Sequence, residues 1–179
     1  IYKLKDEFQD LSLYYLNKDE FLKYYELRNS LKEECSAILQ ELCDMTQSIL
    51  SKSGIAMTYN YRVKNVGGIH DEMINYDDID NICDLFAIKM ILKDELQCYS
   101  AYHAVKYICQ IKNPKSNGYR SLNFNTTYKD LDMQVRIRTE DMQKKNDLGV
   151  FSNWNENTQD KINTDMKKNL EGFAKKMNL

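Results

Sequence analysis

The sequence predicts an α+β domain in which a mixed β-sheet is flanked by helices and braced by a long N-terminal helix. Three patterns favour this class. Residues 131–138, LDMQVRIR, alternate strictly between apolar and polar, which is typical of a half-buried strand. Residues 84–92, DLFAIKMIL, form a nearly continuous apolar run, as expected for a central strand covered on both faces. Apolar residues between 18 and 53 repeat at helical spacing.

Helices are expected before the first strand. Residues 1–16 have amphipathic spacing and are rich in Leu and Tyr. Asn17 followed by Glu20 resembles a capping box, so a second helix should begin just after Asn17. Gly54 favours the C-terminal cap of that helix. This helical segment, 1–54, is expected to pack on the core.

Strands and helices alternate in the rest of the chain. Aromatic and β-branched residues favour strands, and Gly, Pro, Asn and Ser favour turns. The expected elements are a strand over 55–64, a short helix after the glycine pair within 67–76, the strand over 84–92, a helix over 95–110, a turn over 113–119, a hairpin of 120–128 and 131–138 about Lys129–Asp130, and helices from 139 onward.

Composition narrows the class of protein. Hydrophobic residues make up 42%, and no run approaches the ~20 apolar residues of a membrane span. A net charge of −2 argues against a DNA or RNA partner, although it leaves room for a local basic pocket that binds one nucleotide. Five cysteines without CxxC spacing, and two histidines, make no zinc pattern, so reduced core thiols and a cytoplasmic location are expected.

Polar residues at two expected strands suggest a binding site. Asp84 begins an apolar strand, where a buried and unpaired carboxylate would be costly, so it should lie at the end of the sheet and face a cleft. A carboxylate beside cations and a glycine-containing turn favours a phosphate-bearing ligand with Mg²⁺. The alternative is an exposed strand face with cross-strand ion pairs. One face of the 131–138 strand carries Asp132, Gln134, Arg136 and Arg138.

Five segments, in the right order between residues 59 and 154, resemble the synthetase domain of the RelA/SpoT family, which makes guanosine tetra- and pentaphosphate. Segment YRVKN (61–65) is similar to the family's RxK strand, CDLFAIKMIL (83–92) to D-x-x-A-x-R-I, NPKSNGYRSL (113–122) to NPKxNGYxSLH, QVRIRTEDMQ (134–143) to ExQIRT, and DLGVFSNW (147–154) to ELGxAAHW.

The resemblance implies a nucleotidyltransferase-like mixed sheet over 55–156, followed by a C-terminal helix over 157–179. It also implies transfer of pyrophosphate from ATP to the ribose 3′-hydroxyl of GDP or GTP. Related small synthetases assemble through flanking helices, so a homo-oligomer is expected, with packing of these helices on their own sheet as the alternative. By motif position, Arg62 and Lys64 would contact ATP, Asp84 would bind Mg²⁺, Lys115 and Asn117 would hold the guanine nucleotide, Tyr119 would stack on guanine, and Arg138 would hold the charges of the site together.

The most consequential departure from the family is Gln134, because the family has a glutamate there that is implicated in Mg²⁺ binding and in activating the attacking hydroxyl. An amide cannot accept that proton, and loss of a general base typically costs ~10²–10⁴ in rate. Asp132 lies on the same face, ~7 Å along the strand, and could supply a displaced carboxylate. The alternative for Asp132 is an ion pair with a neighbouring Lys or Arg.

Other departures also fall on phosphate-binding and catalytic positions. A basic stretch that precedes the family's NPK motif is essentially absent. The sequence therefore predicts a degenerate, nucleotide-binding module of guanosine tetraphosphate metabolism with weak or lost pyrophosphokinase activity. The alternatives are an active GTP pyrophosphokinase and a toxin-like relative that acts on another acceptor, such as tRNA. The substituted positions are Asn123 and Asn153 for family histidines, Lys89 for an arginine, and Asp71 and Glu72 for a basic pair.

Overall fold

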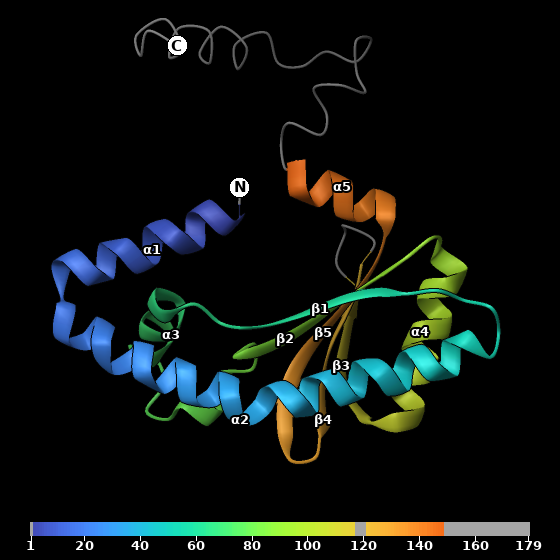
Figure 1. Cartoon of the computed structure of the whole chain (residues 1–179), viewed down its shortest axis with the longest axis horizontal. Coiled ribbons are helices and arrows are strands. Elements are labelled where there is room, and N and C mark those ends of the chain that lie inside the picture. Colours follow the sequence, from blue (N-terminus) through green and yellow to red (C-terminus); the bar gives the residue numbers. More distant parts are fainter. Residues whose placement is uncertain (1, 117–120, 149–179) are drawn as a thin grey trace, which may run out of the picture. The chain divides into compact units, whose positions relative to one another are not determined.

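The computed structural model describes the backbone of residues 2–116 and 121–148. The chain divides into two compact units, residues 1–143 and 144–179, and the architecture below is that of the first. The elements, drawn in Figure 1, are α1 (Tyr2–Leu16), α2 (Lys18–Ser51), β1 (Thr58–Val63), α3 (Val66–Met73), a 3₁₀ turn (Ile79–Asn81), β2 (Phe86–Leu92), α4 (Glu95–Ile108), β3 (Gln110–Ser116), β4 (Leu122–Tyr128), β5 (Leu131–Thr139) and α5 (Glu140–Leu148).

The five strands form one mixed sheet in the order β1-β2-β5-β4-β3. Strand β2 runs parallel to β5, and the other neighbours are antiparallel. The alternating strand predicted over 131–138 is therefore the central strand, and its apolar residues are buried, as the period of two requires. The apolar run that gives β2 lies beside it, buried along most of its length. The predicted α+β class is confirmed.

Helices α2 and α4 cover one face of the sheet (Figure 1). The Tyr59 hydroxyl of β1 donates to Asp44 of α2 at 2.7 Å, and the ring of Phe124 in β4 packs edge-on against Tyr102 of α4. This face supplies the core, because apolar residues of the strands meet apolar residues of both helices there. Its most deeply buried side chains include Leu39, Leu42, Ile88, Met90, Met133 and Val135.

Local signals placed the ends of α2 and the hairpin correctly. The side-chain oxygen of Asn17 accepts from the backbone N–H of Glu20 at 3.3 Å, so Asn17 caps the helix as predicted. The reciprocal bond of a capping box is replaced, because the Glu20 carboxylate accepts from the Asn17 side chain at 3.0 Å and the Asn17 backbone N–H donates to Leu13. Gly54 has φ +68°, the left-handed conformation expected just after a helix. Lys129 and Asp130 form the hairpin turn between paired Tyr128 and Leu131.

Two predicted elements were wrong. The segment predicted as a turn over 113–119 begins inside strand β3, an edge strand. Pro114 lies in the register shift between Lys112 and Lys115, where an edge strand tolerates the missing N–H. Helix α3 begins at Val66, so the glycine pair lies within its first turn rather than before it.

The cysteines are free thiols, as expected from the sequence. Cys35, Cys43, Cys98 and Cys109 are buried, whereas Cys83 is exposed. Burial raises the pKa of the Cys43 thiol to about 12, so that thiol is inert at neutral pH. Within the described residues, none of the helices has both the length and the apolar character that crossing a membrane requires. The C-terminal helix expected over 157–179 lies outside the described residues.

Candidate functional site

The candidate site is the sheet face opposite α2 and α4, called here the polar face. Paired residues on neighbouring strands carry their side chains on the same face, so the register defines rows across the sheet. Strand β5 contributes the central polar residues of both rows. One row contains Arg62, Ala87, Gln134, Asn125 and Lys112, and the next contains Asn60, Lys89, Arg136 and Asn123.

A group of three charged residues, called here the Lys64 cluster, lies where β1 ends and β2 is about to begin. The ammonium group of Lys64 lies 2.5 Å from the Asp84 carboxylate and 2.9 Å from that of Glu72 on α3. Burial lowers the pKa of Lys64, but the hydrogen bonds that its ammonium group donates to these two carboxylates outweigh that effect and raise the pKa overall. Asp84 therefore lies at the end of the sheet, as predicted, and Lys64 neutralises it.

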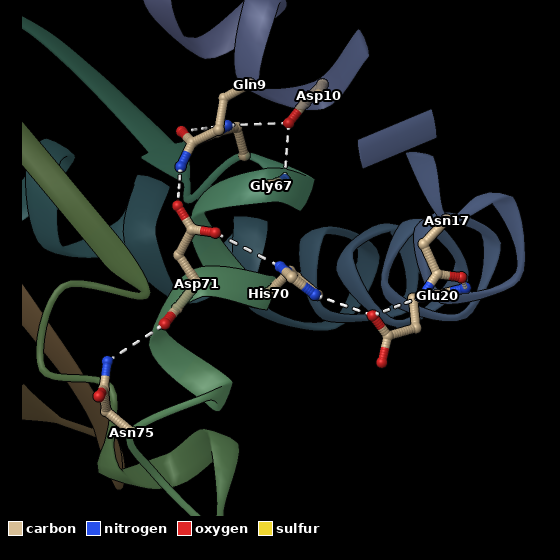
Figure 2. Close-up of polar contacts among 9 residues, drawn as sticks. Gln9, Asp10, Asn17, Glu20, Gly67, His70, Asp71 and Asn75 are labelled. Carbon is tan, nitrogen blue, oxygen red and sulfur yellow. Dashed lines mark hydrogen bonds and ion pairs between the residues drawn. The ribbon is translucent and has the colours of Figure 1, made fainter. Parts of the chain in front are cut away.

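The reversed charges at Asp71 and Glu72 both have partners inside the chain. Glu72 contacts Lys64, as described above. Figure 2 shows Asp71 between two residues: it accepts from the Gln9 side chain at 2.5 Å, and its second oxygen lies 3.3 Å from His70. These acids stand where the family has a basic pair. They therefore serve internal contacts here and add negative charge beside Lys64.

Arg62, which the resemblance assigns to ATP, is also paired with an acid. Its guanidinium lies 3.2 Å from the carboxylate of Asp6 on α1. Both cations expected to meet ATP phosphates, Arg62 and Lys64, therefore contact carboxylates of the chain itself. A phosphate group would have to compete with those carboxylates for either cation.

The central strand carries an amide and a displaced acid. The side-chain oxygen of Gln134 accepts a hydrogen bond from Arg136 at 2.6 Å. Asp132 lies 3.1 Å from the ammonium group of Lys112 and accepts a hydrogen bond from the Thr127 hydroxyl. The hydrogen bond from Thr127, together with Lys112, lowers the pKa of Asp132 despite partial burial. The ion pair weighed as the alternative role of Asp132 is therefore present, and it is directed toward β3 and β4.

The residues present do not suit a magnesium ion. Two or more carboxylates usually hold Mg²⁺ together with ligand phosphates, and a bonded cation blocks a carboxylate. Asp84 is held by Lys64, and Gln134 brings no charge. In residues 2–116 and 121–148, no three or more Asp, Glu, His or Cys side chains come together as metal ligands.

Two polar groups on half-buried residues of the second row lack a partner within the described part of the chain. Lys89 is half-buried at the middle of β2 and makes no hydrogen bond or ion pair with the described part of the chain. The side-chain oxygen of Asn123 is buried with no donor there, although its amide group donates to Ser121. Arg136 stands between them, so Lys89 and Asn123 lie two strand spacings apart, ~10 Å. An unpaired cation and an unpaired acceptor at this separation favour an anionic ligand that also carries N–H groups.

The structure brings together most of the residues that the sequence singled out. Arg62, Lys89, Asn123, Gln134 and Arg136 share the polar face. Arg138 follows two residues after Arg136, opposite Ile91 of β2, and has partners of its own. The roles expected of Asn117 and Tyr119 lie outside the described residues, as does the side chain of Lys115, whose backbone pairs with Asn123.

Sequence reasoning missed Asn125 and the use of Glu72 as a partner of Lys64. The alternation of segment 120–128 could have indicated Asn125, because it has the same parity as Asn123. No local signal predicts the contact of Glu72, because its partner comes from a different element. Glu72 reaches Lys64 only because α3 packs beside the end of β1 in the folded chain.

Comparisons with known proteins bear on the family of the chain and on its fold. The family model described as "Region found in RelA / SpoT proteins" matches residues 61–161, which is more than half of the chain. A GTP pyrophosphokinase of Myxococcus xanthus is 29% identical over 163 residues, which are 84% of this chain and 21% of that protein. The chain spans about a fifth to a quarter of the length of the curated relatives it matches.

Solved structures show the same fold at low identity. Small alarmone synthetase 1 of Bacillus subtilis, bound to its product pppGpp, has a TM-score of 0.57 at 14% identity, covering 69% of this chain and 79% of that one. The same synthetase bound to AMPCPP gives 0.56 at 12% identity, covering 83% and 90%. The expected mixed sheet flanked by helices is thereby confirmed as the fold, and it matches that of the small alarmone synthetases.

Proposed function

This chain belongs to the RelA/SpoT family, and we propose that it is a nucleotide-binding domain of guanosine tetraphosphate metabolism whose pyrophosphokinase activity is weak or lost. One observation carries the proposal. On the polar face, the carboxylates that would serve the reaction are absent or paired with cations of the chain, whereas Lys89 and the buried oxygen of Asn123 have no partner among the residues that the structure describes.

The loss of activity follows from the groups around the expected reaction centre. Transfer to a 3′-hydroxyl requires a group that accepts its proton, and the Gln134 amide cannot do so. Asp132 is no substitute, because Lys112 and Thr127 hold its carboxylate. Since a misplacement of ~1 Å can cost ~10²-fold in rate, a carboxylate ~7 Å along the strand does not restore the geometry.

Retained binding follows from the second row of the polar face. The ammonium group of Lys89, which is half-buried, would hold phosphate oxygens beside Asn123. Arg136 between them adds a planar guanidinium. The pppGpp and AMPCPP complexes of the small alarmone synthetase support a guanine nucleotide as the ligand to test, with ATP as the second.

Calorimetric titration with GDP, GTP and ppGpp tests the binding half of the proposal. At least one of the three should bind, and Lys89→Met should weaken that binding at least tenfold, because a hydrogen-bonded charge is removed. The matched control is Lys52→Met, which removes an exposed lysine beyond the end of α2 and should leave the affinity unchanged. The proposal fails if none of the three binds, or if Lys89→Met binds as tightly as the parent.

A further inference from the structure

Helix α1 contacts the polar face and α3 mainly through polar side chains. Besides the Asp6–Arg62 ion pair, Asp10 accepts hydrogen bonds from the backbone N–H of Gly67 at 2.7 Å and from the Asn65 side chain at 2.8 Å (Figure 2 shows the former). Gln9 adds its hydrogen bond to Asp71. The acids of α1 thus occupy one cation of the polar face and the first turn of α3.

The approach of α1 is close enough to require a glycine. A Cβ at position 67 would lie 2.7 Å from Cγ of Gln9 and 2.9 Å from the Gln9 backbone oxygen. This distance explains why a glycine stands inside the first turn of α3, where it costs helix stability. Two features of the sequence therefore permit α1 to dock: the acids on α1 itself, and the absence of a side chain at Gly67.

The same helix buries little apolar surface. Of its described side chains only Leu13 is fully buried, whereas a stripe at helical spacing remains outside: Leu4 at 56%, Phe8 at 68%, Leu11 at 50% and Tyr15 at 80% exposure. Elements with few buried apolar contacts open at low free-energy cost. Helix α1 is thus held mainly by charge and hydrogen bonds, which an anion can replace.

We propose that helix α1 is an intramolecular competitor of polyphosphate: its Asp6 and Asp10 carboxylates occupy groups that phosphate oxygens would otherwise contact, so α1 docking and polyphosphate binding exclude one another. Guanidinium and helix-start N–H groups favour carboxylates and phosphates for the same reason. Releasing α1 would free Arg62 and the Gly67 N–H together. The proposal rests on the nucleotide-binding function above, which it extends to regulation.

Binding of inorganic tripolyphosphate to the full chain, measured by calorimetry, tests this inference. The double variant Asp6→Ala/Asp10→Ala should bind tripolyphosphate at least tenfold more tightly than the parent. The matched control, Glu7→Ala/Glu26→Ala, removes the same number of charges from exposed positions of α1 and α2 and should change the affinity less than twofold. Circular dichroism verifies that both variants fold.

A second variant should displace α1 from its docked position without changing the net charge of the chain. Gly67→Ala should push α1 away through the clash with Gln9, and so should also tighten tripolyphosphate binding and speed hydrogen exchange over residues 4–16. If both Asp6→Ala/Asp10→Ala and Gly67→Ala bind tripolyphosphate no better than the parent, the inference is overturned, even where GDP binds as proposed. Tighter tripolyphosphate binding with no guanine-nucleotide binding would instead support the inference and reject the proposed function.

Discussion

At the residue scale, the distinctive feature is how the charges at Asp71 and Glu72 are used. The sequence alone identifies them as reversals where the family has a basic pair. Their consequence depends on which side chains lie nearby, and the fold places Glu72 against Lys64 and Asp71 against Gln9 and His70. Both acids thus take part in contacts between elements of the fold.

Replacing Lys64 tests the Lys64 cluster. Lys64→Met should lower the free energy of unfolding at pH 7 by about 1–2 kcal/mol, below the cost for a fully buried pair because both carboxylates are partly exposed. Lys32→Met, at an exposed position of α2, should have no measurable effect. Urea unfolding measures both. An unchanged stability of Lys64→Met would show that the cluster does not hold β1, α3 and β2 together.

The pH dependence of the same variant has a defined sign. The folded pKa of Lys64 lies above its ordinary value of 10.5, so its stabilisation is fully present below that pH and is lost as the pH rises through the raised value. The difference in the free energy of unfolding between the parent and Lys64→Met should therefore become smaller at high pH.

At the element scale, the sequence predicted helices and strands wherever the hydrophobic period was clear. It identified α1, α2, β1, β2, α4 and the β4–β5 hairpin, with ends within a few residues. It missed β3, because a proline, a glycine and two asparagines conceal a strand whose pairing depends on β4. The start of α3 was misplaced because a glycine pair is a breaker by propensity, and contact with α1 overrides that propensity.

The β4–β5 hairpin offers a prediction at this scale. Lys129 and Asp130 have φ of +49° and +62°, which side chains with a Cβ adopt at a cost. Asp130→Gly should raise the free energy of unfolding by about 0.5–1 kcal/mol, and Asp130→Ala should not raise it. Thermal unfolding of the three proteins distinguishes them. A loss of stability in Asp130→Gly would contradict the proposed strain.

At the scale of the whole molecule, the charges are arranged unevenly over the polar face. The side of β1 and α3 carries five acids, of which Asp6 pairs with Arg62, and Glu72 and Asp84 pair with Lys64. The other two are Asp10 and Asp71. The second row carries Lys89 and Arg136. The sequence singled out Asp71, Glu72 and Asp84 and the cations of both groups, but it gave no sign of Asp6 and Asp10 on α1. It could not predict which cations are paired inside the chain, because those pairs join elements far apart in sequence.

This arrangement of charges favours nucleotide binding without pyrophosphate transfer. Under the proposed function, the second row would hold a guanine nucleotide, whereas a pyrophosphate donor would meet acids and, among the described residues, would find neither an unpaired pair of carboxylates nor a proton acceptor. The chain spans about a fifth to a quarter of the length of its curated relatives. Binding without turnover is therefore the central expectation.

The most direct measurement is AMP formation by the full chain with Mg²⁺, ATP and GDP, alongside titration of GDP into the same preparation. The account predicts bound GDP and no AMP above the rate without protein. Steady AMP production that Asp84→Ala abolishes would contradict it, because Asp84 would then serve the reaction despite Lys64.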